Sequence, residues 1–220
     1  MKRVGSLIFF AVVLYVQISA QKSMAIGGYF SPSYTSRLTS SSEELSWLNT
    51  DMNNISRAGF GYSLGVFGEE KISDRLSVRA GLGYSSMDEN IDSLSTVGVD
   101  LFKSSYRFIE IPVLVYSSFG ANKYVRPYVS FGYVLNYYIN NRITYSYAGS
   151  NNEETRLVKY DFNAVNHALR VSFGYDFVLD KKWNLRTECF ANSFVSSLTN
   201  QGITRRPIAF GLSLNLRKSK

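Results

Sequence analysis

The chain has 220 residues, with 24 lysines and arginines against 17 acidic residues and a formal net charge of +7. Its only cysteine is Cys189, so no intramolecular disulfide can form, and its only histidine is His167. One histidine, one cysteine and no dense acidic motif exclude a metal cluster. The basic residues form no run and no helical face, which argues against nucleic acid as a partner.

The first 20 residues have the pattern of a secretory signal peptide. The start (residues 1–3) is basic, an apolar stretch occupies residues 7–16, and the segment ends on the small residue Ala20. The apolar stretch is too short for a transmembrane helix, which takes roughly 20 residues. We therefore expect residues 1–20 to be removed on export and residues 21–220 to form one outer-membrane β-barrel domain.

Beyond this segment, apolar and polar residues alternate with a period of two, which places successive side chains on opposite faces of a β-strand. The alternation is clearest near the end of the chain, where Phe210, Leu212 and Leu214 are separated by Gly211 and Ser213. The pattern predicts eight strands, at residues 24–32, 57–71, 76–86, 105–118, 126–139, 165–177, 183–195 and 208–216.

The connections between these strands alternate in length. Short turns are expected at residues 73–74, 120–122 and 180–182, and long loops at 33–56, 87–104, 140–162 and 197–206. Short periplasmic turns, long external loops and an even strand count are typical of transmembrane barrels. The sequence therefore predicts an all-β fold, an eight-stranded antiparallel up-and-down transmembrane β-barrel with both mature termini in the periplasm.

The contents of the two strand faces decide between a membrane barrel and a soluble, lipocalin-like one. One face is crowded with Leu, Val, Phe and Tyr, and the other is rich in Gly and Ser with a few charges. An eight-stranded barrel has an interior just wide enough for side chains to fill, which suits the small and charged face, and lipid accommodates the bulky face. Seven aromatic residues near strand ends are expected to form an interfacial belt: Tyr62, Tyr84, Tyr106, Tyr116, Tyr137, Tyr175 and Trp183.

Residues 106–119 (YRFIEIPVLVYSSF), followed by Arg126-Pro127-Tyr128 and Gly132, resemble the aromatic–hydrophobic–Glu–Ile–Pro strand of PorT-like outer-membrane β-barrel proteins. The resemblance implies an outer-membrane barrel domain, a type that is mostly of unassigned function. One founding member is associated with protein secretion across the outer membrane, but no residue here marks that branch. The chain departs from the common barrel ending, because it closes on Arg-Lys-Ser-Lys (residues 217–220) and not on an aromatic residue.

Strand parity predicts five charged side chains in the lumen: Glu110, Glu188, Arg79, Arg170 and Arg186. Two carboxylates in one cavity could act as an acid–base pair. A filled barrel leaves little room for a substrate, however, and interleaved arginines hold both acids ionised. We therefore expect a salt-bridge network in which Glu110 and Glu188 balance the arginines.

Three further residues are expected on the outer wall near the external rim. His167 would need a serine nucleophile and a carboxylate to serve a lipid A deacylase, and the local sequence has no His-x-Ser arrangement, so an interfacial histidine is the simpler interpretation. Arg107 and Arg206 could bind phosphates of the outer-leaflet glycolipid through their guanidinium forks, or extend toward water. The sequence does not decide between phosphate binding and extension toward water for these two arginines.

These patterns predict a non-enzymatic outer-membrane protein that acts as a structural, adhesion or assembly/secretion-partner protein through its long external loops. The expected partners are outer-membrane lipids, an envelope protein bound by the external loops, and the barrel-assembly machinery during biogenesis. A lipid-modifying enzyme (a glycolipid acyl hydrolase or transferase) is the alternative, and a narrow solute channel is a weaker third. No catalytic, cofactor-binding or metal-binding residue is assigned.

Overall fold

The structure is a computed structural model, and it describes residues 24–41, 56–94, 99–120, 122, 124–147, 153–158, 162–199 and 203–218. The predicted signal peptide lies outside these residues. Within these ranges the chain forms nine strands: β1 (Met24–Ser41), β2 (Ser56–Lys71), β3 (Leu76–Leu94), β4 (Val99–Ser118), β5 (Val125–Tyr147), β6 (Glu153–Val158), β7 (Val165–Val178), β8 (Trp183–Phe194) and β9 (Ile203–Lys218). The described part contains no helix that is long and apolar enough to cross a membrane.

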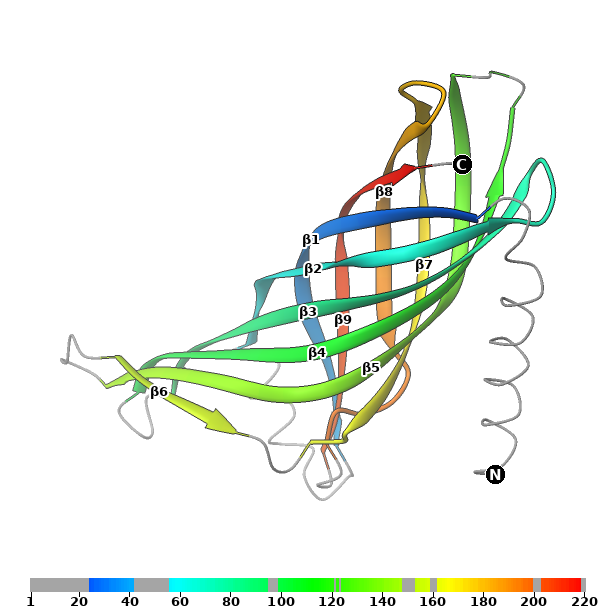
Figure 1. Cartoon of the computed structure of the whole chain (residues 1–220). Helices are drawn as coiled ribbons and strands as arrows, with labels where there is room; N and C mark the ends of the chain where they lie inside the picture. Colours follow the sequence, from blue (N-terminus) through cyan, green and yellow to red (C-terminus); the bar gives the residue numbers. More distant parts are fainter. Residues whose placement is uncertain are drawn as a thin grey trace, which may run out of the picture.

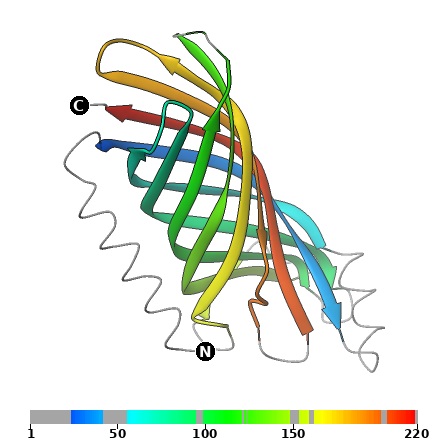
Figure 2. The same cartoon turned by 90° about the vertical axis from the view of Figure 1, so that its right-hand side faces the viewer.

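Eight of the strands close into a barrel in which every neighbouring pair is antiparallel (Figures 1 and 2). Around the ring the order is β1, β2, β3, β4, β5, β7, β8 and β9, and β9 pairs with β1 to complete it. Closure gives every strand edge a hydrogen-bonding partner, as backbone groups in hydrocarbon require. The predicted eight-stranded antiparallel barrel is confirmed.

The short turns and both described chain ends lie at one end of the barrel. β2 and β3 are joined through residues 72–75, β4 and β5 through 119–124, and β7 and β8 through 179–182. Ile26 in β1 is paired with Lys218 in β9, and Figure 1 shows the C-terminus beside these turns at the upper right. Since short turns face the periplasm in transmembrane barrels, this is the periplasmic end and the opposite one is the external end.

The strands continue further at the external end than the sequence predicts. β1 runs to Ser41, β3 runs to Leu94 and β4 already begins at Val99, so much of the predicted loops 33–56 and 87–104 is strand. The predicted loop 140–162 contains the end of β5 and the additional strand β6, which pairs with β5 alone. Backbone pairing outside a membrane needs no apolar face, so these extensions lack the alternation that marks the spanning strands.

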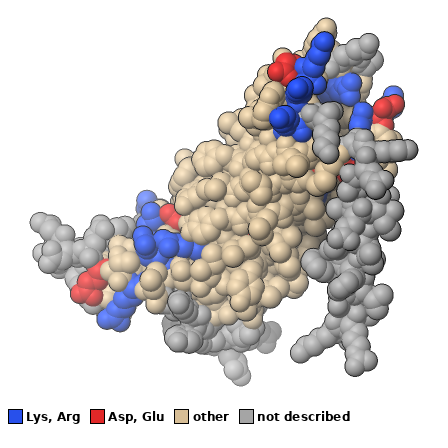
Figure 3. All heavy atoms as spheres, viewed as in Figure 1, with Lys and Arg blue, Asp and Glu red and all other residues tan. Residues whose placement is uncertain are grey.

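The predicted assignment of the two strand faces is correct. On β9, Leu212 is 59% exposed and faces outward, whereas its neighbour Ser213 is 1% exposed and faces the lumen. On the face of the barrel drawn in Figure 3, a broad band without charged side chains lies between charged groups at the two ends. An uncharged band of exposed apolar side chains is the surface that a bilayer requires.

Two of the seven tyrosine and tryptophan residues predicted for the interfacial belt are placed wrongly. Tyr106 and Tyr116 are 5% and 2% exposed and point into the lumen. Both share the parity of Glu110 on β4, so the strand alternation sends all three side chains inward. Tyr137, Tyr175 and Trp183 are exposed on the outer wall, as the belt requires, and Tyr62 and Tyr84 are half-buried.

Candidate functional site in the barrel lumen

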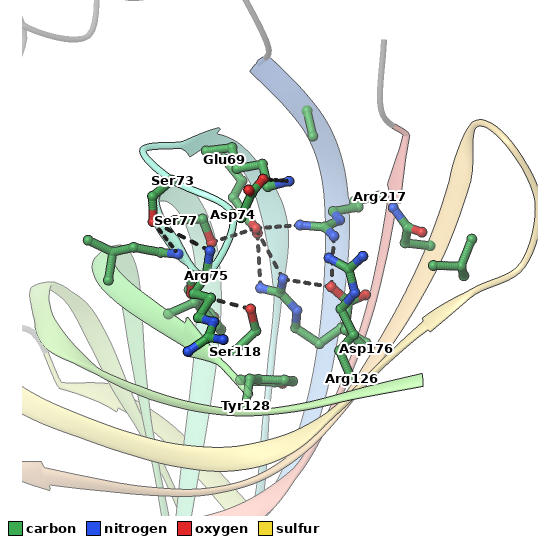
Figure 4. A pocket seen from close by; sticks show the side chains of 17 residues that line it. Glu69, Ser73, Asp74, Arg75, Ser77, Ser118, Arg126, Tyr128, Asp176 and Arg217 are labelled. Carbon is green, nitrogen blue, oxygen red and sulfur yellow. Dashed lines mark hydrogen bonds and ion pairs between the residues drawn. The ribbon is translucent and has the colours of Figure 1, made fainter. Parts of the chain in front are cut away.

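The periplasmic half of the lumen is organised around one buried carboxylate, Glu69 on β2. It accepts hydrogen bonds from Nε and Nη2 of Arg79 at 3.2 and 2.9 Å, and from both terminal nitrogens of Arg186 at 3.0 and 3.1 Å. Arg217 also pairs with it, and the Ser77 hydroxyl donates at 2.9 Å. With Glu69 itself, these groups come from the four strands β2, β3, β8 and β9. Figure 4 labels three of them, Glu69, Ser77 and Arg217, at the periplasmic end of the lumen.

A second acid, Asp176 on β7, extends this network toward the far wall. It pairs with Nη2 of Arg186 at 3.1 Å and with Nη2 of Arg217 at 2.7 Å. Arg186 and Arg217 therefore each lie between two carboxylates. The ring of Tyr116 lies between two guanidinium groups, with its centroid 4.5 Å from Arg79 and 4.3 Å from Arg186. Cation–π contacts of this kind add to the ion pairs when both partners are removed from water.

A smaller group of bonds lies around Glu188. Its carboxylate accepts hydrogen bonds from Tyr128 and Ser172, both at 2.8 Å, and forms an ion pair with Arg170 at 3.3 Å. Glu110 accepts a hydrogen bond from the Tyr29 hydroxyl at 2.6 Å.

All five predicted charges point into the lumen, but their pairing differs from the prediction. Glu188 does pair with an arginine, whereas Glu110 accepts a hydrogen bond from a tyrosine. Glu69 takes the central role that was expected of Glu110. The expectation missed Glu69, which stands in a polar Glu-Glu-Lys run at the end of β2. Parity alone could have found it, because Glu69 alternates in step with the inward residue Ser63.

A cavity of about 340 Å³ opens at the periplasmic end of this network (Figure 4). Its walls include Arg75, Arg126 and Ser118 at the rim and Glu69 and Asp176 deeper inside. Each of the two deep carboxylates is already paired with at least two arginines, so neither is free to face a substrate as a general acid or base. The arrangement suits a structural ion-pair network better than an acid–base pair.

The external half of the lumen is filled by apolar and aromatic side chains. Phe108 is fully buried, and its ring centroid lies 5.9 Å from that of Tyr138 and 5.7 Å from that of Phe194. Around them pack the other members of the cluster, Met87, Tyr106, Val134, Ala168, Leu198 and the partly buried Phe162. We call these nine residues the aromatic plug.

The outer wall near the external rim carries the remaining predicted residues. His167 is half-buried, its ring is hydrogen-bonded to the Tyr133 hydroxyl, and the Ser196 hydroxyl accepts from its backbone N–H at 2.8 Å and not from its ring. A serine–histidine nucleophile is therefore not assembled among the described residues. The described part also holds no group of three His, Cys, Asp or Glu side chains that could bind a metal. Arg107 is half-buried and Arg206 is exposed.

Residues 17–200 match the family described as the outer membrane protein beta-barrel domain. Comparison with curated proteins gave no match. Among solved structures the chain is similar to the outer membrane protein OprG from Pseudomonas aeruginosa, at 10% identity and a TM-score of 0.51, covering 90% of this chain and 95% of that one. It is also similar to Neisserial surface protein A (14%, 0.45, covering 88% and 95%) and to the outer membrane protease OmpT from Escherichia coli (8%, 0.47, covering 90% and 97%). Because the family match spans most of the chain, this outer membrane protein belongs to the outer membrane protein beta-barrel domain family.

Proposed function

We propose that this protein is a closed, non-conducting and non-enzymatic barrel of the PorT-like type, which acts as a structural, adhesion or assembly-partner protein through its external wall. The observation that supports this most directly is the filled lumen. The aromatic plug occupies the external half and the arginine–carboxylate network occupies the periplasmic half. Eight-stranded barrels have room for little more than their own side chains.

The external wall offers the surface for such a role. β3, β4 and β5 have 19, 20 and 23 residues, whereas roughly 9–11 residues suffice to cross a bilayer. In Figure 1 these strands, with β6 beside β5, extend to the lower left beyond the rest of the barrel. The protruding sheet is polar: Thr144 bonds to Thr155 at 3.3 Å, and the Tyr145 hydroxyl donates to Glu154 at 2.7 Å. A polar, hydrogen-bonded wall of this kind suits contact with an envelope protein.

Single-channel recording in planar bilayers tests the closed lumen. We expect the folded protein to insert without opening a pore, because the buried apolar side chains of the plug pack against one another across the lumen. Steady ion-conducting steps from the wild type, at protein levels where a general porin conducts, would contradict the proposal and favour the channel.

Site-specific photo-crosslinking in cells tests the external wall. A photoreactive residue at the exposed Leu157 on β6 should capture one defined envelope protein, whereas the same residue at Leu212 in the uncharged band should capture none. If both positions capture the same set of proteins, or if neither captures any, the wall is not a specific contact surface.

A lipid-modifying enzyme is the second candidate. The observation that favours it is the hydrogen bond between the His167 ring and the Tyr133 hydroxyl on the outer wall. Mass analysis of the outer-membrane glycolipid from cells with and without the protein separates the two functions. We expect identical acylation patterns. A change in acyl chain number that disappears in a His167→Ala variant would favour the enzyme.

A further inference from the structure

The outward-facing charges of the barrel begin abruptly at the external boundary of the uncharged band. On β4 the outward positions from Ile109 to Ser117 carry no charge, and the next outward residue toward the external end is Arg107. On β9 the same holds for Ile208 to Leu216, and the next outward residue is Arg206. Each of these two segments is nine residues long and carries no outward-facing charge, and roughly 9–11 residues are needed to span a bilayer. Arg107 and Arg206 therefore lie at the level of the outer-leaflet headgroups.

Arg107 is accompanied by a second arginine on the neighbouring strand. Arg107 is paired with Asn140 of β5, and Arg142 is the next residue of β5 on the same outward face. Residues in this diagonal relation lie about 7–8 Å apart. Tyr84 on β3 is paired with Ile109 of β4, two residues from Arg107, so it lies diagonal to Arg107 at the edge of the same patch. Figure 3 shows the basic side chains of this end gathered beside the uncharged band at the lower left.

Neither arginine of this pair has a carboxylate partner among the residues that the structure describes. Asp88 of β3 is diagonal to Arg107, which is paired with Ser86, but its carboxylate forms an ion pair with Lys103, further out on the same face, at 3.0 Å. The two guanidinium groups, diagonal to each other on neighbouring strands, carry like charges that repel. Two unpaired arginines at a membrane boundary therefore call for an anion that the protein does not itself supply.

We propose that Arg107 and Arg142 together bind a phosphate group of the outer-leaflet glycolipid, with Tyr84 at the hydrocarbon side of the headgroup. A phosphate presents oxygens that match two guanidinium forks, and charge-assisted bonds of this type are about twice as strong as neutral ones. The acyl chains of the same lipid would lie along the uncharged band below, against Ile109 and Leu82, which are 41% and 54% exposed. The site is thus specific for a phosphorylated lipid, and not for a free anion.

Arg206 provides a matched control on the opposite wall. It lies at the same boundary of the band, but β9 is four strands from β4 around the ring in either direction. In the described part of the chain, no second arginine accompanies it on the outward face. An isolated arginine can extend toward water, whereas a pair shares one doubly charged group.

The experiment measures binding of a diphosphorylated glycolipid to the folded barrel in detergent micelles by native mass spectrometry. The wild type should bind this lipid at least about tenfold more tightly than the same lipid after removal of both phosphates. Arg107→Gln with Arg142→Gln should remove that difference, and Arg206→Gln should keep it within about twofold. Heat-shifted gel mobility confirms that each variant is folded, and Arg142→Gln alone replaces the double variant if folding fails.

Three outcomes would overturn the assignment. Equal binding of phosphorylated and dephosphorylated lipid by the wild type would remove the phosphate from the interaction, and this comparison needs no variant. Unchanged binding in the folded arginine variants would place the phosphate elsewhere on the barrel. Full competition by inorganic phosphate at the concentration of the lipid would assign the pair to a free anion.

Discussion

Arg186 and Glu69 meet face to face across the lumen, although they are 117 residues apart in the sequence and their strands are not neighbours. Two parallel hydrogen bonds of 3.0 and 3.1 Å join the guanidinium fork to the carboxylate. β8 and β2 are separated around the ring by β9 and β1, so this contact joins two strands that share no backbone hydrogen bonds. A bidentate pair of this kind fixes orientation as well as charge.

Removing the charge of Glu69 should destabilise the barrel strongly. Glu69→Gln leaves Arg79, Arg186 and Arg217 close together without their common anion, and breaking a buried ion pair typically costs about 3–5 kcal/mol. The measurement is urea unfolding of the barrel in lipid vesicles, followed by loss of the folded gel-mobility form.

Glu110→Gln is the matched control, since it changes another buried glutamate in the same lumen. The amide oxygen of glutamine can still accept the bond from Tyr29, so we expect a loss of only about 1 kcal/mol. If the two variants are equally unstable, Glu69 is not the centre of the network.

The number of barrel strands and the inside–outside assignment could be predicted because they follow from local alternation. Ser213 and Leu212 differ by one position and are 1% and 59% exposed, as a period of two requires. The same rule predicts that Arg79, Arg170 and Arg186 point inward. Tyr106 and Tyr116 were misassigned where position near a strand end was given more weight than this parity.

The partners within the lumen could not be predicted in the same way. Which arginine reaches Glu69 depends on the stagger of all eight strands, and Arg217 and Glu69 lie 148 residues apart in sequence. β6 was missed for a different reason. Its sequence EETRLV has no apolar face to bury, so only its backbone pairing with β5 marks it as a strand.

A methyl group at Gly83 should disturb the contact between Tyr29 and Glu110. A Cβ atom on Gly83 would collide with the Tyr29 hydroxyl and would lie 2.8 Å from the carbonyl oxygen of Leu64. Because that hydroxyl is held by Glu110 at 2.6 Å, it cannot move aside freely. We expect Gly83→Ala to cost about 1–3 kcal/mol in vesicle unfolding measurements.

Gly28→Ala serves as the control for this substitution, because a Cβ there meets only the Gly65 carbonyl oxygen at an ordinary 3.5 Å. Its effect should stay within about 0.5 kcal/mol. A destabilisation of equal size at both glycines would indicate a general effect of the added methyl group, unrelated to Tyr29.

Truncating the centre of the aromatic plug should leave a cavity. Phe108 is 0% exposed between Tyr138 and Phe194, and Phe→Ala at a packed site costs about 3–5 kcal/mol. Phe131→Ala on the outer wall should cost roughly half as much, because Phe131 is 56% exposed and mobile lipid chains refill the space. Unfolding of the two variants in the same vesicles checks the order, and a larger loss at Phe131 would contradict the description of the plug as a core.

The position of the membrane can be tested with one arginine placed at two heights on β9. Leu212 lies at the middle of the uncharged stretch 208–216 and is 59% exposed on the outer wall, whereas Ile208 lies at its external boundary beside Arg206. An arginine facing lipid costs about 2–4 kcal/mol at the midplane and about 0–1 kcal/mol near the interface. Leu212→Arg should therefore lower the folded fraction after refolding into vesicles far more than Ile208→Arg. Both substitutions add the same side chain to the same strand, so β-propensity and size cancel in the comparison. Equal refolding of the two variants would mean that position 212 does not face hydrocarbon, whereas the predicted difference places the membrane midplane near Leu212.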